Sequence, residues 1–392
     1  MRKILLIAVS LLLLLGLVFF SQIRLGVLSA LFLWDLLDEE GVRSPHRGAL
    51  AWITSTPSVN GMFIPVGERA IAADLYHYQD GKKRAAILLT NGIIETGKDD
   101  PRLIRFAYSL ARSGFVVLVP ELLGMKSLRV RLSDVEDIVA SFRFLGLLEN
   151  RVDKEKMGLL GFSYGAGPTF MAAAHPSIRN QVKFITSFGG YYDPINVIRF
   201  ITTGYYEYRD EKGFLRPEPY GKWVFFVNNL DYVERESDRK ILKEIFKKEE
   251  SGQTGERREI QALLKGLSPE GQALYELLVN KDPYRVEGLF EKTDRKFQDY
   301  LQRISLSQVI PSVDAYMLIG HGTTDSLIPY TESLRLADAV RDGSRVHMTI
   351  LKLFSHVDPT RKSYSAKEFL TVYLPSLAQF YYLIYDILSQ QL

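Results

Sequence analysis

The sequence predicts an α/β protein in which a mostly parallel sheet is flanked by helices, with a helical insertion and an N-terminal membrane helix. Short apolar runs alternate with helix-like segments over residues 61–190, the alternation stops over 191–310, and it returns over 311–392. Parallel strands are buried on both faces and therefore appear as near-continuous apolar runs, with helices as the crossovers between them. We therefore expect one sheet domain, built from the first and last of these parts and interrupted by the insertion.

The expected strands are compact apolar runs that end at turn residues. They cover residues 62–66, 70–77, 85–90, 115–119, 156–160, 182–188, 315–319 and 346–353. Helical periodicity covers residues 135–148, 331–340 and 369–388, and a further helix is expected from Pro101 with Asp99 or Asp100 as its cap. The final helix has polar interruptions, so we expect it to pack on the sheet and not to cross a membrane.

Composition and charge exclude several classes of function. The chain has 392 residues, of which 46% are hydrophobic and 24% charged, as in an ordinary globular core. The formal net charge is only +3 and the basic residues are interspersed with acids, so no nucleic-acid partner is expected. Without cysteine the chain can form no disulfide, thiolate zinc site or Cys nucleophile. We find no phosphate-binding glycine loop and no metal-ligand pattern, so no cofactor and no metal are expected.

The N-terminus predicts attachment to a membrane. Arg2 and Lys3 precede an apolar run over residues 4–20, which falls at the short end of the roughly 17–25 residues that a span requires. A cleaved signal peptide has the same charged start, but no small-x-small site follows this run directly. We therefore expect an uncleaved single-pass anchor over residues 1–24, with the body on the non-cytoplasmic side. Residues 25–60 would form a juxtamembrane segment.

A G-x-S-x-G element at residues 161–165 follows one of the predicted strands directly. A serine on a sharp strand-to-helix turn has a strained backbone and crowded neighbours, so small residues are needed two positions to either side of it. Ala166 and Gly167 would let the next helix approach the sheet closely. The element therefore predicts that Ser163 is a nucleophile, although a plain Gly/Ser-rich loop has the same composition.

A serine nucleophile needs a base, which is normally a histidine held by a carboxylate. On a sheet of this kind the chain order is Ser, then acid, then His, with the partners in loops after later strands. His356 lies in the polar loop after the last predicted strand and is the expected base. The remaining histidines are expected to be surface, packing or strand residues: His46, His77, His175, His321 and His347.

The expected acid is Asp325, in the loop that follows the predicted strand at residues 315–319. This loop comes one strand before His356, as the chain order requires. Asp193 and Asp358 remain as alternatives, although Asp358 is only two residues from the base. Two backbone amides are expected to bind the developing oxyanion. They are the N–H of Tyr164, directly after the nucleophile, and that of Ile93, in the loop after the strand at residues 85–90.

Together these features resemble the α/β-hydrolase superfamily, and particularly its dienelactone-hydrolase and prolyl-oligopeptidase-like branches. The matching parts are the strand end at Asn91-Gly92, the serine element, the acid loop at residues 320–329 and Ser355-His356. The resemblance covers roughly residues 70–388 outside the insertion. Many relatives have His-Gly where this chain has Asn91-Gly92, so any role of that histidine is absent.

The resemblance implies a serine hydrolase, carboxylesterase- or lipase-like, that cleaves small-molecule or lipid-like esters and less often amides. It also places the 191–310 insertion as a cap over the active site. The aromatic residues of the insertion would then line an acyl pocket or simply pack its own core. A peptidase, an acyltransferase or a non-catalytic binding module with the same fold are the alternatives.

Overall fold

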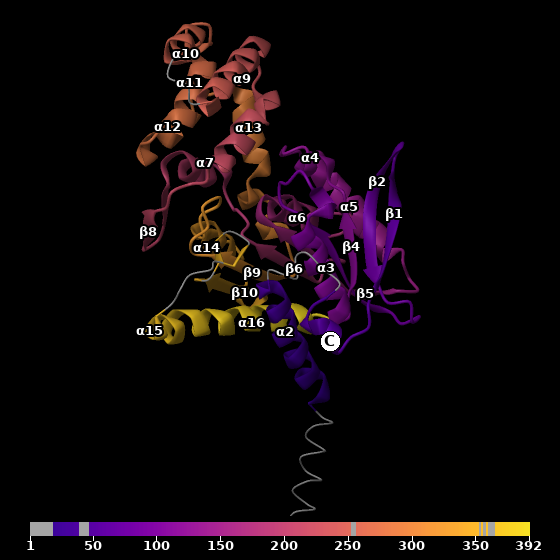
Figure 1. The fold of residues 1–392 in the computed structure, drawn as a ribbon. Coiled ribbons are helices and arrows are strands. Elements are labelled where there is room, and N and C mark those ends of the chain that lie inside the picture. Colours follow the sequence, from indigo (N-terminus) through magenta and orange to yellow (C-terminus); the bar gives the residue numbers. More distant parts are fainter. Residues whose placement is uncertain (1–18, 39–46, 252–255, 353, 356–357, 360–364) are drawn as a thin grey trace, which may run out of the picture.

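The computed structural model describes residues 19–38, 47–251, 256–352, 354–355, 358–359 and 365–392 (Figure 1). Its centre is an eight-stranded sheet in the order β1-β2-β4-β3-β5-β6-β9-β10. The strands are β1 Ser58–Val66, β2 Arg69–His77, β3 Arg84–Thr90, β4 Val116–Pro120, β5 Val152–Phe162, β6 Phe184–Phe188, β9 Tyr316–Gly322 and β10 Val346–Leu351. Strand β2 is antiparallel to both β1 and β4, whereas all later neighbours in the sheet are parallel. The predicted mostly parallel sheet is therefore confirmed.

Helices cover both faces of this sheet. Helices α2 (Phe20–Leu37), α3 (Pro101–Ser113) and α16 (Leu374–Ser389) share one hydrophobic cluster with one face, and α5 (Ser133–Gly146), α6 (Ala166–Ala173) and α14 (Thr331–Asp338) share another cluster with the opposite face. Strand β3 shows why its sequence is continuously apolar. Ile87 and Leu89 belong to the first cluster, and Ala86 and Leu88 belong to the second. Successive side chains of a strand point to opposite faces, so both sets must be apolar.

The start of helix α3 shows how the local sequence sets an element boundary. The Asp100 side chain accepts hydrogen bonds from the backbone N–H groups of Arg102 and Leu103, and Pro101 occupies the first turn. The helix ends at Ser113 and is followed by Gly114, whose φ of 118° suits a glycine. Of the two predicted capping residues, Asp100 is the one that caps.

The chain between β6 and β9 forms a separate layer beside the strand ends (Figure 1). It contains helices α7 Pro194–Thr203, α8 Pro219–Lys222, α9 Glu236–Ser251, α10 Glu256–Leu264, α11 Pro269–Val279, α12 Val286–Phe290 and α13 Arg295–Ile304. It also contains a hairpin of β7 (Tyr205–Tyr208) and β8 (Glu211–Phe214), which the expectation of a helical insertion did not include. The turn of this hairpin lacks the Asn-Gly or Asp-Gly pair that usually marks one in sequence. Arg209 adopts the positive φ there instead, at 54°.

Helix α2 is one continuous helix that begins where the N-terminal apolar run ends. Within the described residues, α2 is the one helix whose length and composition would allow it to cross a membrane. One face of it is buried, however, and packs against α3 and α16, with Leu25, Leu28 and Phe32 in the contact. The predicted boundary between anchor and juxtamembrane segment falls inside this helix, and residues 1–18 of the predicted anchor lie outside the described part of the chain.

Candidate active site

Ser163 stands on a sharp turn between strand β5 and helix α6. Its φ is +52°, a left-handed conformation that costs a non-glycine residue about 1–2 kcal/mol. Glycine is required at two neighbouring positions, because other backbone segments approach them closely. A Cβ on Gly161 would lie 2.7 Å from the Cα of Ala166, and a Cβ on Gly165 would lie 2.0 Å from the carbonyl oxygen of Asn91. The turn therefore has the strain and the crowding that the G-x-S-x-G element predicts.

The residue after the serine begins a helix that is packed tightly against its surroundings. Tyr164 belongs to a single 3₁₀ turn, Ser163–Gly165, that leads directly into α6, so its N–H is among the first amides of the helix and has no acceptor within it. The ring of Tyr164 stacks on that of Tyr191, with 4.8 Å between ring centroids. Gly167 faces the same Tyr191 ring, and a Cβ there would lie 2.3 Å from the tyrosine oxygen. Burial raises the pKa of both tyrosines, so they stay neutral.

The loop after β3 passes directly beside the serine. A Cβ on Gly92 would lie 3.0 Å from Cβ and 3.5 Å from Oγ of Ser163. The next residue, Ile93, lines the same cavity as Ser163. Its carbonyl oxygen accepts a hydrogen bond of 3.1 Å from the hydroxyl of Tyr220, a residue of the insertion. The loop that carries the Ile93 amide is thus held between the sheet and the insertion.

Asp325 lies in the loop after β9 and is fully buried. Its Oδ1 accepts hydrogen bonds from the backbone N–H groups of Leu327 (2.8 Å) and Ile328 (2.9 Å). Its Oδ2 lies 3.1 Å from Nε2 of His321. Donors to a carboxylate favour its ionised form and fix its orientation. The loop that holds Asp325 also lines the cavity, through Ser326, Leu327 and Ile328.

His321 holds the carboxylate of Asp325 and is not placed to act as a base. Its Nε2 faces two acceptors, Asp325 Oδ2 at 3.1 Å and the carbonyl oxygen of Ile328 at 3.0 Å, which assigns the proton to this nitrogen. Its Nδ1 lies 2.7 Å from the hydroxyl of Ser333, which can donate to it. Both ring nitrogens are therefore engaged away from Ser163. The prediction that His321 is a structural residue at the end of a strand fits these contacts.

His356, the predicted base, lies outside the described residues. The residues on either side of it form the short strands β11 (Phe354–Ser355) and β12 (Asp358–Pro359), which pair antiparallel. The backbone of β11 lies near β9, the strand that leads to the acid loop. The segment that precedes His356 is thus close to the strand that leads to Asp325.

Three other histidines and the alternative acid Asp193 are engaged in local structure, whereas His46 and the side chain of Asp358 lie outside the described part of the chain. His77 contacts Asn60, His175 contacts Ser177 and His347 contacts Asp386, each through a side-chain hydrogen bond. Asp193 caps helix α7, because its Oδ1 accepts from the N–H of Ile195 at 2.9 Å. These local contacts account for the positions of the four side chains, and none of them requires a catalytic role.

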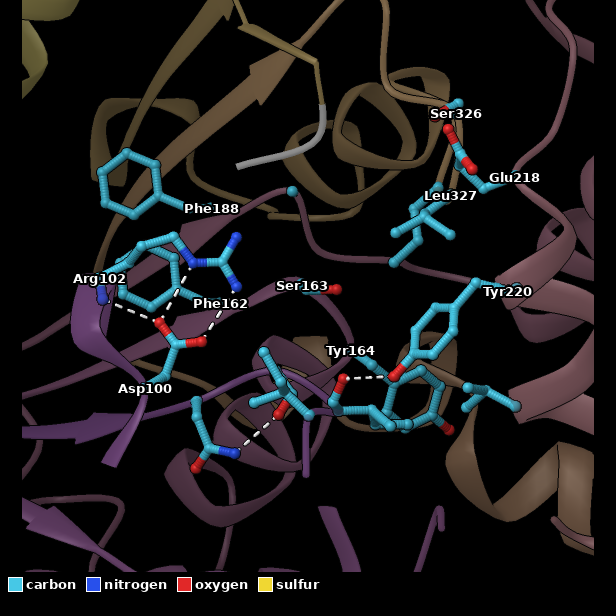
Figure 2. A pocket seen from close by; sticks show the side chains of 18 of the residues that line it. Asp100, Arg102, Phe162, Ser163, Tyr164, Phe188, Glu218, Tyr220, Ser326 and Leu327 are labelled. Carbon is cyan, nitrogen blue, oxygen red and sulfur yellow. Dashed lines mark hydrogen bonds and ion pairs between the residues drawn. The ribbon is translucent and has the colours of Figure 1, made fainter. Parts of the chain in front are cut away.

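A cavity of about 1100 Å³ surrounds Ser163 and extends to both sides of it. Figure 2 shows the serine between two groups of side chains, Phe162 and Phe188 on one side and Tyr220 and Leu327 on the other. The insertion contributes aromatic and aliphatic side chains to the wall, among them Val197, Ile201, Tyr220, Trp223, Val224 and Phe225. No group of three or more His, Asp or Glu side chains placed to hold a metal occurs in the part of the chain that the structure describes.

Sequence reasoning missed one residue of this cavity and one that holds the start of the insertion. Tyr220 is one of many aromatic residues of the insertion, and nothing in its neighbourhood marks it as the residue that reaches Ile93. Glu332 is equally unmarked in sequence, yet its buried carboxylate accepts hydrogen bonds from the N–H groups of Tyr192 (3.0 Å) and Asp193 (2.7 Å), where the insertion begins. Only the general aromatic enrichment of residues 191–232 pointed toward the cavity.

Solved structures share this architecture at low sequence identity. The uncomplexed acylaminoacyl peptidase of Pyrococcus horikoshii is similar over 88% of this chain and 43% of its own, with 14% identity and a TM-score of 0.51. A dienelactone hydrolase from Anabaena variabilis is similar over 86% of this chain and 100% of its own, with 13% identity and a TM-score of 0.44. This chain spans less than half the length of the peptidase. No family model and no curated protein matches the sequence. The likeness shows that the chain has the α/β-hydrolase fold, as predicted.

Proposed function

We propose that this protein, which has the fold of the α/β-hydrolases, is a serine hydrolase that cleaves ester-type acyl bonds through an acyl-enzyme intermediate. The observation that carries the proposal is Ser163, held at a φ of +52° on a strand-to-helix turn in the wall of a large apolar cavity. Backbone strain at a cavity wall is a reason to look for function, because folding alone gains nothing from it.

In the proposed reaction Ser163 Oγ attacks the ester carbonyl while His356 takes its proton. Asp325 holds the imidazole in the required tautomer and stabilises the cation that forms. The amides of Tyr164 and Ile93 bind the oxyanion, and the proton on His356 passes to the leaving alcohol. Water then attacks the acyl-enzyme with His356 again as base, which releases the acid and restores the serine hydroxyl. The role of His356 rests on its place in the sequence.

The buried geometry of Asp325 supports its assignment as the acid. A carboxylate that accepts two backbone hydrogen bonds and faces an Nε2–H donor is stabilised as the anion even without exposure to water. It is also held rigidly, which a group that orients a histidine must be. The apolar cavity favours an ester with hydrophobic substituents over a charged substrate.

We further propose that the N-terminal segment tethers the protein to a membrane, with the sheet domain on the non-cytoplasmic side. The apolar run over residues 4–20 and the basic residues before it support this proposal. Helix α2, which follows, has an exposed apolar stripe of Phe20, Ile23, Val27 and Trp34 on the side opposite to its buried face. Such a stripe is suited to contact with lipid.

The test is hydrolysis of p-nitrophenyl butyrate and labelling by a fluorophosphonate probe, in the full chain and in two serine variants. Ser163→Ala is expected to lose at least about 10³-fold in kcat and all labelling. Ser163→Gly removes the same hydroxyl but relieves the positive φ, so it is expected to be inactive and at least as stable as the wild type. Loss of activity in both variants separates loss of the nucleophile from loss of the fold.

Four outcomes would point elsewhere. Full activity in Ser163→Ala would show that Ser163 is not the nucleophile. Labelling at Ser163 with turnover of amide but not ester substrates would make the protein a peptidase, and ester turnover that needs an added alcohol acceptor would make it an acyltransferase. An intact, folded protein that is neither labelled nor active would be a binding module.

A further inference from the structure

We propose that helix α2 forms part of the substrate site, and that the arm of the cavity beneath it receives a long acyl chain. This inference rests on the proposed ester hydrolase function and names the substrate class for the same site. Leu36, in the last turn of α2, lines the cavity together with Ser163. The N-terminal helix is therefore more than a tether, because its end forms part of the wall of the catalytic cavity.

The arm, hereafter the acyl arm, is defined by apolar side chains from α2, α3, α16 and the strand ends. Its lining residues are Leu36, Leu103, Phe106, Phe162, Phe188, Leu351 and Phe380. Four of them form a continuous aromatic wall. The ring centroids of Phe106 and Phe162 are 5.0 Å apart, those of Phe162 and Phe188 are 5.4 Å apart, and those of Phe188 and Phe380 are 6.4 Å apart.

Phe162, the residue before the nucleophile, places this wall directly beside Ser163, and Figure 2 shows Phe162 and Phe188 on one side of the serine. Apolar chains are bound by the area they bury, at about 25 cal/mol per Å², so a lining of this kind selects for chain length. The whole cavity of about 1100 Å³ is also slightly larger than the pockets that ordinarily hold small ligands, roughly 300–1000 Å³. A short acyl group such as acetyl would leave most of the acyl arm unfilled.

The charged residues near the acyl arm are neutralised by one another. Arg102 pairs with the carboxylate of Asp100 at 3.0 Å, and Nη2 of Arg105 lies 3.7 Å from the carboxylate of Asp38. The opposite side of the cavity carries, beside the apolar side chains of the insertion, the polar side chains of Glu218 and Ser326 and the hydroxyl of Tyr220 (Figure 2). We therefore assign the apolar chain to the acyl arm and the leaving alcohol to the side of the insertion.

Helix α2 is fixed to the body well enough to act as a wall. The buried carboxylate of Asp35 accepts hydrogen bonds from the backbone N–H groups of Ala49 and Leu50, and Tyr381 of α16 donates to the carbonyl oxygen of Gly26 at 3.3 Å. Burial raises the pKa of Asp35, and these amide donors oppose that shift. Leu36 follows this anchored residue directly, so its position relative to Ser163 is set by the same contacts.

The experiment measures kcat/KM for p-nitrophenyl esters of four, eight, twelve and sixteen carbons with the full chain in one fixed detergent. The wild type is expected to prefer the longer chains. Leu36→Trp narrows the acyl arm and is expected to lower the ratio of twelve-carbon to four-carbon hydrolysis at least about tenfold. Leu36→Ala widens it and is expected to move the preference toward sixteen carbons. Leu147→Trp, at an exposed position elsewhere, is the matched control and is expected to keep the wild-type profile.

The outcomes separate this inference from the proposed function. If Ser163 is labelled and short esters are cleaved, but both Leu36 variants keep the wild-type chain-length profile, α2 does not bound the substrate and the inference is wrong. If no ester of any length is cleaved and Ser163 is not labelled, the proposed function itself fails. Because the two Leu36 variants act in opposite directions, a folding defect in one of them cannot produce the expected pair of shifts.

Discussion

The sheet domain and the 191–310 insertion contribute to one cavity in different ways. The sheet places the proposed reactive groups through its backbone, with Ser163 on a strained turn, Gly92 against it and Asp325 held by the two amides that follow it. The insertion contributes side chains, such as Tyr220 and Trp223, that shape the cavity but belong to no regular pattern. The proposed chemistry is therefore specified by short, local sequence elements, whereas the shape of the cavity depends on contacts between distant residues.

If the sheet carries the chemistry, the largest effect should follow from a change in the acid. Asp325→Asn is expected to lower kcat by about 10³- to 10⁴-fold, because the neutral amide no longer selects the productive histidine tautomer. It should also lower stability by about 1–3 kcal/mol, since the amide nitrogen would face the Nε2–H of His321. Ester hydrolysis and thermal unfolding measure the two effects.

Asp193→Asn is the matched control, because asparagine also caps helices well and Asp193 caps α7. Its activity is expected to stay within a few-fold of the wild type. The opposite result, a large loss in Asp193→Asn and little in Asp325→Asn, would move the acid to the start of the insertion and remove the distinction between the two regions.

The stability contributed by the junction between the two regions, where Glu332 lies, should depend on pH. Burial raises the pKa of Glu332 to about 7 from an ordinary 4.5, and its carboxyl accepts the N–H groups of Tyr192 and Asp193. A carboxyl with a raised pKa in the folded state contributes stability below its unfolded pKa, and this contribution is lost as the pH rises through about 7. The size is on the order of 3 kcal/mol, from 2.5 pKa units at 1.36 kcal/mol each.

Glu332→Gln keeps an acceptor for the two amides but cannot ionise. Relative to this variant, the wild type should lose on the order of 3 kcal/mol of unfolding free energy between pH 4.5 and pH 8. Urea unfolding at several pH values measures the difference, and Glu276→Gln, on an exposed position of α11, serves as the control. If the unfolding free energies of the wild type and Glu332→Gln change with pH in the same way, the carboxyl of Glu332 does not titrate in this range.

The same division explains what the sequence could and could not predict. The strands, the crowded glycines around Ser163 and the cap at Asp100 follow from local patterns, and the structure has them at or near the predicted positions. The hairpin at Tyr205–Phe214 has no turn signal, and its Tyr206 packs against Tyr330 of the sheet domain, with 5.5 Å between ring centroids. Such a contact depends on the tertiary fold and leaves no periodic trace.

The N-terminal helix was the least predictable part of the site. The sequence showed an apolar run and a second apolar stretch after it, which fits a tether followed by a juxtamembrane segment. In the structure Leu36 instead reaches the cavity around Ser163, because α2 packs beside α3 and α16. A hydrophobic residue near the end of an apolar helix looks the same in sequence whether it faces lipid, core or substrate.

The smallest expected effect tests whether the insertion acts on the chemistry at all. Tyr220→Phe removes the hydrogen bond of 3.1 Å to the carbonyl oxygen of Ile93, while the ring keeps its place in the cavity wall. A bond of this kind contributes about 0.5–1.5 kcal/mol, so kcat is expected to fall about threefold to tenfold. KM should change little if the bond only positions the Ile93 amide for the oxyanion, since such a loss is confined to the transition state. Tyr284→Phe, at an exposed tyrosine of the insertion outside the cavity lining, is the control. A rise in KM with unchanged kcat would instead show that Tyr220 binds the substrate, and the insertion would then shape the cavity without touching the reaction.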